Sequence, residues 1–474
     1  MATPIFICGA ECGVVDVGFS GTGNRHWDLA SGTVTADTTT VRNGLRSFRV
    51  NASAGAIVRY RTISSTRVVG RLAVLFASLP TSDVNLIRLA NSNGNLGIWY
   101  RSSGTNLVAS IGTGGDASGP AVTTNVWYVL DWDAASSGAT ATLDWQVDAT
   151  PQTQATNSQA TASMTLFGFG ALTTTTADMY FDDIILSYTA ADYPFGDGKV
   201  LGYSPNASGS HSFTAGDFQD ELSGDIALPA GDVHTRLDER PITSIADYIK
   251  QVVINSVGYI RASFESTSET TDARGVMVVS CQHSSGTTAN TATLKLDDGG
   301  TLDDVYSGDI SQVSAIYTDK CYAAPPSGGT WQQAIINALA IRWGYSDNIA
   351  SVPYLDGVIL EIEWAVLAVT PKTVSDSLSL LESMTVRALA TLQETLVLSD
   401  SAVIVGSQLV SITDELGILE GLSAYALYLP ADYPAADLVR VARTTHISLL
   451  ERLQSCKTDV YTAIRKKKKP VYRL

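Results

Sequence analysis

Residues 179–206 read MYFDDIILSYTAADYPFGDGKVLGYSPN, and we predict that they join the last strand of one β domain to the start of another. The first ten residues put apolar side chains on both faces of a strand, which is typical of a position inside a sheet. Pro and Gly residues then break regular structure. The heptapeptide YFDDIIL at 180–186 recurs in altered form as YLDGVIL at 354–360. A closing strand that occurs twice indicates a building block that is used twice.

The segments on either side of this stretch have the residue pattern of β domains. Residues 1–190 contain short β-forming runs separated by Gly, Ser and Asn clusters, with no segment of helical periodicity. Strands spaced this closely predict an antiparallel sandwich or jelly roll. Residues 199–366 look similar, apart from one helix expected at 331–341. We therefore predict a mainly β protein with two tandem antiparallel β-sandwich domains, at 1–190 and 199–366, and a linker at 191–198.

The last strand of the second domain is expected at 354–364. Tyr354, Val358 and Leu360 alternate with other residues and should face the core. The opposite side of the strand ends in Glu361 and Glu363, so we expect that side to meet water.

The pattern acid-x-Leu-x-(Leu/Ile)-x-acid repeats after the second domain. It starts at Asp376, Glu394 and Asp414, at offsets of 18 and then 20 residues. Each copy predicts a thin strand with too little apolar surface to bury alone. For residues 372–424 we expect a homo-oligomerising region, most simply a trimeric shaft. A small strand layer packed on the second domain is the alternative.

Length and charge narrow the class of protein. A chain of 474 residues is too long for one ordinary core. Its net charge of −16 argues against a nucleic-acid partner. The C-terminal segment, 431–474, ends in RKKKKPVYRL with six positive charges. This tail is either solvated or docks on an acidic surface such as another copy of the chain.

The N-terminus has neither a basic start nor a long apolar core, so it predicts no signal peptide. No apolar run approaches the roughly 18 residues of a membrane span. We expect a protein that is made in the cytoplasm and does not insert into a membrane.

The cysteines do not predict a disulfide scaffold. There are five, and they are sparse for the length: Cys8, Cys12, Cys281, Cys321 and Cys456. Cys8 and Cys12 lack the second ligand pair that a zinc site would need, so we expect buried strand cysteines. A bond between Cys281 and Cys321 stays open.

Catalytic motifs are missing from the sequence. The five histidines form no H-E-x-x-H or H-x-H pair, and there is no G-x-S-x-G elbow and no phosphate loop. Asp182 and Asp183 are neighbours on a strand and should point to opposite faces. We interpret them as structural acids that accept hydrogen bonds. We predict no catalytic residue, no cofactor and no metal.

Two weak candidate binding sites remain. Trp99, Tyr100 and Arg101 precede a turn, and one of two adjacent aromatic side chains must face away from the core. That side chain would contact either a sugar or another subunit. The weak candidates for calcium ligands are carboxylates that read more simply as a solvated acidic hairpin: Asp297, Asp298, Asp303 and Asp304.

Short segments of the chain carry a family resemblance. In the first domain they are PIFICG at 4–9, GLRSFRVN at 44–51, VWYVL at 126–130 and YFDDIIL at 180–186. With these the domain resembles the concanavalin A-like, laminin G-type jelly rolls of tailed-bacteriophage virion proteins. Residues 196–206 and 331–344 are similar to a companion β domain of such proteins, and the acid-Leu repeats are similar to those of phage fibres.

The resemblance implies a non-enzymatic structural component of a tailed-phage virion, namely a tail fibre, minor tail or head decoration protein. Its lectin-like domain would contact host surface glycan or neighbouring virion proteins. Glycosidases of this family carry E-x-D-x-E on one strand face, and this sequence has no such triplet. A polysaccharide-degrading tail enzyme and a stand-alone soluble lectin are the alternatives.

Overall fold

The computed structural model is almost entirely β, as predicted. Two compact units divide the chain, Met1–Leu367 and Ala368–Leu474. Among the described residues, no helix has the length and apolar character needed to cross a membrane. The structure describes residues 2–13, 26–112, 114–209, 211–212, 217–220, 233–240, 242, 248–252, 258–286, 291–310, 316–345, 352–366, 398–405, 409–416 and 425–428.

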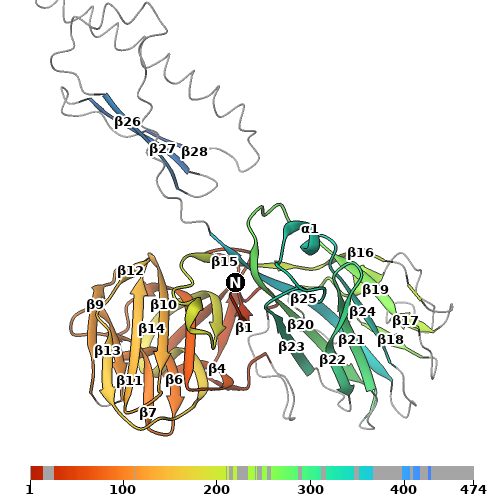
Figure 1. Ribbon diagram of the computed structural model, residues 1–474, viewed down its shortest axis with the longest axis horizontal. Helices are drawn as coiled ribbons and strands as arrows, with labels where there is room; N and C mark the ends of the chain where they lie inside the picture. Colours follow the sequence, from red (N-terminus) through yellow and green to blue (C-terminus); the bar gives the residue numbers. More distant parts are fainter. Residues whose placement is uncertain are drawn as a thin grey trace, which may run out of the picture. The chain divides into compact units, whose positions relative to one another are not determined.

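The first half of Met1–Leu367 is one antiparallel sheet of 14 strands (Figure 1). Its longest strand, β14, pairs with β4 on one side and with β5 and β6 on the other, so the stretch 179–187 lies mid-sheet as predicted. The strands are β1 Pro4–Cys8, β2 Leu29–Ser31, β3 Val34–Asp37, β4 Ser47–Ser65, β5 Arg67–Ser78, β6 Val84–Asn91, β7 Gly94–Arg101, β8 Asn106–Ile111, β9 Ala117–Ala121, β10 Trp127–Ala135, β11 Thr140–Val147, β12 Thr150–Pro151, β13 Ala155–Ser158 and β14 Met164–Ser187.

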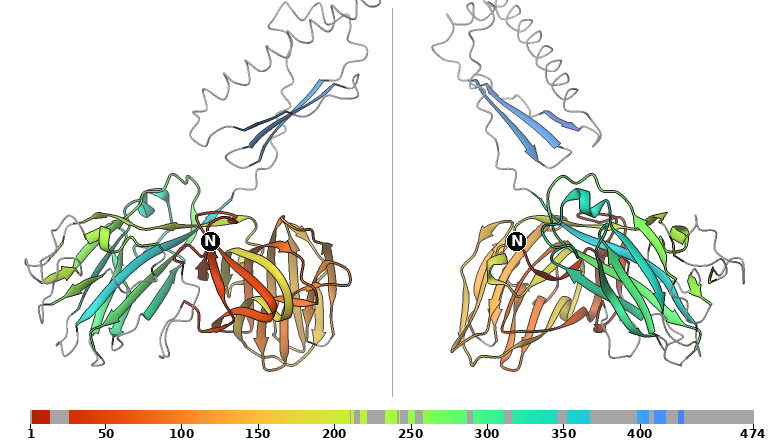
Figure 2. Two further views of the ribbon diagram at one scale, coloured as in Figure 1. Left: turned by 180° about the vertical axis from the view of Figure 1, so that it is seen from behind. Right: turned by 45° about the vertical axis from the view of Figure 1, so that its right-hand side comes forward.

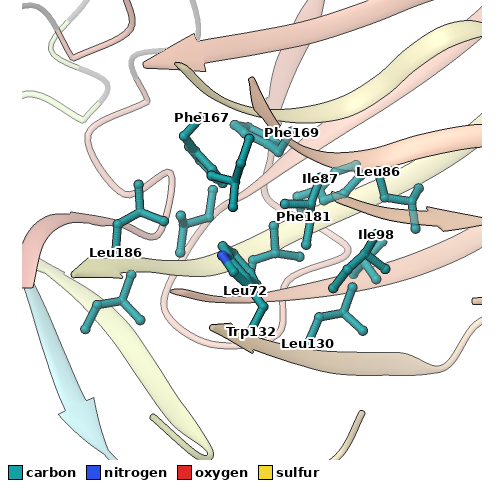
Figure 3. Close-up of a cluster of buried hydrophobic side chains, with 14 of the residues drawn as sticks. Leu72, Leu86, Ile87, Ile98, Leu130, Trp132, Phe167, Phe169, Phe181 and Leu186 are labelled. Carbon is teal, nitrogen blue, oxygen red and sulfur yellow. The ribbon is translucent and has the colours of Figure 1, made fainter. Parts of the chain in front are cut away.

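Inward side chains of β5, β6, β7, β10 and β14 meet in one apolar cluster (Figure 3). Trp132 stacks on Phe167 with ring centroids 6.1 Å apart. The same indole lies over Gly70, where an added Cβ would be 2.2 Å from the ring. Only glycine fits at this position of β5, because any side chain would displace the tryptophan.

The second half contains two further antiparallel sheets. One has the order β17-β18-β25-β20-β23 with β15 on β25, and the other has the order β16-β19-β24-β21-β22. Buried side chains of both sheets share a core, so the sheets pack face to face as a sandwich. The elements are η1 Ala190–Asp192, β15 Gly198–Tyr203, β16 Pro205–Ser208, β17 Phe218–Asp220, η2 Val233–Arg236, β18 Ile249–Gln251, β19 Ile260–Phe264, β20 Ala273–Ser284, β21 Thr291–Asp297, β22 Leu302–Asp309, β23 Ile316–Tyr322, α1 Gln333–Ile336, β24 Ala340–Tyr345 and β25 Pro353–Ala365.

The helix expected at 331–341 is wrong over most of its length. Helix α1 covers only Gln333–Ile336, and Ala340 already belongs to β24. Strand β24 pairs with β19 on one side and β21 on the other. Leu339, Ile341 and Trp343 are all fully buried. Their period of two places them in the sandwich core, and this burial overrides the helical spacing of the residues before them.

The two halves of Met1–Leu367 are in close contact. Strand β1 pairs with β14 and also lies against the second half, between the two β bodies seen in Figures 1 and 2. The first apolar cluster continues into Met277, Val279 and Ile359 of the second half. A Cβ at Gly275 of β20 would lie 2.6 Å from Pro4 Cγ, so β1 packs directly on that backbone. That residues 191–198 are a linker between two independent domains stays a prediction.

Unit Ala368–Leu474 is described over three strands. Strands β26 Leu398–Val405, β27 Leu409–Leu416 and β28 Tyr425–Tyr428 form an antiparallel sheet in chain order. The end of the second acid-Leu repeat, 398–400, lies in β26, and the start of the third, 414–416, lies in β27; the rest of both repeats lies outside the described residues. The first repeat, the segment 431–474 and its basic tail lie outside the described residues. The trimeric shaft stays a prediction.

Candidate functional site

The triplet predicted to bind sugar is split between the core and the surface. Tyr100 is 1% exposed and packs on Phe76, with ring centroids 5.6 Å apart. Trp99 is partly exposed, and the Arg101 guanidinium lies 4.9 Å from its ring centroid. Arg101 also pairs with Asp83 and Asp116 at 3.2 and 2.9 Å. Trp99 and Arg101 therefore remain surface candidates, whereas Tyr100 is part of the core.

The acidic hairpin predicted as a weak calcium candidate is held by basic side chains. Asp297 Oδ2 accepts hydrogen bonds from Arg342 at 2.7 and 2.9 Å and from Arg261 at 3.2 Å. Burial alone would raise the pKa of Asp297, but these bonds outweigh it and the pKa is lowered. Asp303 pairs with Lys320, and Asp304 pairs with Lys295.

Asp298 completes this hairpin by accepting hydrogen bonds from the backbone N–H groups of Thr301 and Ser327, at 3.1 and 2.7 Å. All four carboxylates therefore already have protein partners that a cation would have to displace.

Asp182 and Asp183 are both fully buried and accept hydrogen bonds, as predicted. The prediction that they point to opposite faces of the strand is wrong. Asp183 has a positive φ of 54°, and the pairing of β14 with β5 shifts register between Asp182 and Ile185. This bulge turns both carboxylates toward one loop, where Asp182 accepts from the Arg42 backbone at 3.0 Å and Asp183 accepts from Asn43 Nδ2 at 2.7 Å. The pair anchors this loop to β14.

A group of four reactive side chains lies where β1 meets the second half of the unit. Cys8 ends β1, His26 precedes β2, Asp319 lies in β23 and Glu361 lies in β25. None of these residues is more than 3% exposed. Cys8 Sγ is 3.0 Å from His26 Nε2, and His26 Nδ1 is 3.1 Å from Asp319 Oδ2. A thiol, an imidazole and a carboxylate thus stand in line inside the protein.

Asp319 fixes the orientation of the imidazole. Arg61 donates from both terminal nitrogens to Asp319, at 2.5 and 2.9 Å, and also to the His26 carbonyl at 3.1 Å. Burial would raise the pKa of Asp319, but the Arg61 charge and the bond to His26 outweigh it and lower the pKa. An ionised Asp319 accepts a hydrogen bond from Nδ1–H, which leaves the Nε2 lone pair directed at Cys8.

The Glu361 carboxylate also lies close to the thiol. Its Oε1 accepts a hydrogen bond from the Cys12 backbone at 3.1 Å. Its Oε2 is buried and has no hydrogen-bond partner among the described residues. Burial, followed by the nearby Glu361 charge, raises the pKa of the Cys8 thiol well above its usual value. A buried thiol that stays protonated is a poor nucleophile, so this Cys-His-Asp line is not arranged for catalysis.

The sequence pointed to only part of this group. Cys8 was expected to be a buried strand cysteine, and it is. Glu361 and Glu363 were expected to meet water, and that prediction is wrong because both are fully buried. The remaining cysteines of the second half, Cys281 and Cys321, are free thiols.

Asp131 on β10 makes the stability of the contact between the two halves of Met1–Leu367 depend on pH. Asp131 is 1% exposed, and burial raises its pKa to about 7 although Arg71, Arg274 and the backbone N–H groups of Phe195 and Gly196 lower it. Between about pH 4 and about pH 7 the folded state therefore holds one more proton than the unfolded chain, and rising pH lowers stability over this window.

The Asp131→Asn variant should remove this dependence. Its free energy of unfolding, relative to the wild type, should rise by on the order of 4 kcal/mol between pH 4 and pH 7, since a tenfold change in protonation is worth about 1.4 kcal/mol. Urea unfolding at several pH values measures the difference. Parallel pH profiles for the two proteins would show that the folded-state pKa of Asp131 is not raised.

Comparison with known proteins adds little. No protein-family model and no curated protein matches the chain. A sialidase from Trypanosoma rangeli in complex with the inhibitor DANA matches at 15% identity and a TM-score of 0.27, over 36% of this chain and 30% of that one. Domain 4 of an extracellular arabinanase from Geobacillus stearothermophilus, in complex with arabinotriose, matches at 15% identity and a TM-score of 0.23, over 39% of this chain and 82% of that domain.

The chain spans about 30% of the length of the first of these sialidases. A likeness this slight carries no argument about function.

Proposed function

We propose that the chain is a non-enzymatic structural component of a tailed-phage virion, either a fibre, a minor tail protein or a head decoration protein. The observation that supports this most is that Met1–Leu367 is one compact unit whose two halves are joined by one fully buried and one largely buried ion pair. Charged pairs that are buried and geometrically fixed hold neighbouring elements in one arrangement. A stiff β body of this kind suits a component that carries load within a particle. The short segments that resemble phage virion proteins support the same assignment.

We further propose that the first β body contacts host surface glycan or a neighbouring virion protein through Trp99 and Arg101. The partly exposed indole of Trp99 offers apolar surface for a sugar ring beside the Arg101 guanidinium, and the nearby carboxylates of Asp83 and Asp116 offer acceptors for hydroxyl groups. Asp83 and Asp116 also hold Arg101 in place over the indole.

Polysaccharide prepared from the host surface tests the glycan proposal. The wild-type chain should bind it, and Trp99→Ala should weaken binding at least tenfold. Val126→Ala is the control, since Val126 is an exposed apolar residue elsewhere on the same body. Equal binding by the Trp99→Ala variant would place the contact elsewhere. Release of new reducing ends by the wild type would instead support a polysaccharide-degrading tail enzyme.

Phage particles purified by density banding test the virion proposal. Peptides of this chain should be found in the particles at a constant ratio to the major capsid protein. A chain found only among the soluble proteins of the lysate would contradict the proposal.

Deleting residues 372–474 should convert a homo-oligomer, most simply a trimer, into folded monomers. The acid-Leu repeats in that segment are too thin to bury their apolar side chains within one chain. Light scattering coupled to gel filtration measures the mass, and deletion of residues 465–474 alone is the control for the basic tail. A truncated protein with unchanged oligomer mass would refute the role of the repeats.

A further inference from the structure

We infer that Cys8, His26 and Glu361 form a binding site for a divalent transition metal of the zinc class. The ligand atoms of these three residues lie within 4.8 Å of one another. They come from β1, from the segment before β2 and from β25, so a metal here would join the first half of Met1–Leu367 to the second. This inference does not rest on the proposed virion role.

The donor atoms decide which kind of metal fits. One sulfur, one imidazole nitrogen and one carboxylate oxygen suit zinc and related borderline ions, whereas calcium and magnesium prefer oxygen ligands only. Cys8, as the thiolate it becomes on binding a metal, and Glu361 would supply two anionic ligands, and His26 presents Nε2 toward Cys8.

Spacing between the donors is close to what a tetrahedral ion requires. Bonds of about 2.3 Å to sulfur and about 2.0 Å to nitrogen, at a tetrahedral angle, separate the two donor atoms by roughly 3.5 Å. Cys8 Sγ lies 3.0 Å from His26 Nε2, and Cys12 Sγ lies 3.9 Å from the same nitrogen. The Cys8–His26 distance is somewhat shorter than the required value, so the two side chains would shift slightly to admit an ion. Cys12 lies near the site but is not one of the three residues whose ligand atoms all lie within 4.8 Å of one another.

The imidazole has the surroundings of a metal-binding histidine. A ligating histidine usually donates its other ring N–H to a carboxylate, which fixes its tautomer and raises its basicity. Asp319 stands at that position, and Arg61 holds it from the far side. The partly buried side chain of Arg61 thus supports an imidazole that is already oriented for an ion.

An independent observation is the state of Glu361. The side chain is fully buried, and its Oε2 has no hydrogen-bond partner among the described residues. A buried carboxylate oxygen without a partner costs on the order of 1–3 kcal/mol or more, and native proteins rarely tolerate it. Coordination of a cation beside Cys8 and His26 would satisfy this oxygen.

Metal content of the untagged full-length chain tests the inference. After removal of loosely bound ions, elemental analysis should find about one zinc per chain, and the melting temperature should rise with added zinc. Cobalt substitution should give a thiolate-to-cobalt charge-transfer band, which reports sulfur ligation directly. Cys8→Ser and His26→Asn should lose the zinc and the band. Cys281→Ser is the control, because Cys281 is a free thiol of β20 whose Sγ lies against Asp356 and is not one of the three ligands.

Two milder variants cover the possibility that a ligand variant fails to fold. Glu361→Gln keeps the shape of the side chain and should weaken zinc binding at least tenfold. Asp319→Asn should weaken zinc binding about 10–100-fold, as is usual when the carboxylate that orients a ligating histidine is removed. A folded wild-type chain that takes up no zinc from a zinc-containing buffer would overturn the inference. So would equal zinc content in the wild type and a folded Cys8→Ser variant.

Discussion

Replacing Arg71 with methionine should lower the free energy of unfolding by about 3–5 kcal/mol, because it leaves a buried carboxylate without its main partner. Arg71 on β5 donates to both oxygens of Glu363 on β25, at 2.6 and 2.8 Å. Both side chains are fully buried. Arg274 alone would then face Glu363, at 3.0 Å. Arg71 also donates to the carbonyls of Asp183 and Gly196, so the variant removes contacts within the first half and at the junction together.

Lys295→Met is the control for this variant. Lys295 on β21 pairs with Asp304 at 2.9 Å, and 39% and 52% of the two side chains are exposed. An exposed pair of this kind is worth about 1 kcal/mol or less. Urea unfolding of the full-length chain, followed by tryptophan fluorescence, compares the two variants. A loss in the Arg71→Met variant no larger than that of the control would show that the buried pair does not hold the junction together.

Replacing Trp27 with alanine should cost about 3–5 kcal/mol, the usual range for removing a fully buried tryptophan. Trp27 is 0% exposed. Its ring centroid lies 5.2 Å from those of Phe6, His26 and Phe169, and 5.7 Å from that of Phe48. The indole therefore packs β1 and β4 against β14 and also supports the histidine of the inferred metal site.

Trp99→Ala provides the comparison for Trp27→Ala, since Trp99 is only partly buried on the outer face of β7. We expect it to change stability by about 1 kcal/mol or less. Thermal and urea unfolding measure both variants. Trp27→Ala should also weaken zinc uptake, because the cavity it leaves lets the imidazole of His26 move. Similar stability losses in the two variants would contradict the placement of Trp27 in the core.

The strands and the repeated closing motif could be predicted from the sequence because both depend on local residue patterns. YFDDIIL at 180–186 lies in β14, and YLDGVIL at 354–360 lies in β25, and each strand is flanked on both sides within its sheet. β-branched and aromatic residues that alternate with other residues predict a strand from only a few consecutive positions. The helix at 331–341 failed because burial between two neighbouring strands decided the structure of Ala340 and Ile341, and no local pattern reports that burial.

The candidate metal site could not be predicted from the sequence for a different reason. Cys8 and Cys12 are close in sequence, but His26, Asp319 and Glu361 join them only through packing of distant strands. Glu361 and Glu363 lie on alternate positions of β25 and therefore read as a solvent-facing edge. Strand β1 and the Arg71 guanidinium cover that face. Acidic residues on one face of a strand thus marked a buried junction, which sequence alone cannot distinguish from a surface.

Native-state hydrogen exchange on the full-length chain tests most directly whether Met1–Leu367 behaves as one rigid body. We predict that amides of β14 and β25 exchange through the same opening reaction with the same free energy, and that Arg71→Met lowers both values equally. Exchange from β25 at a distinctly lower free energy, unaffected by Arg71→Met, would contradict this prediction. The two halves would then be separate domains that merely touch.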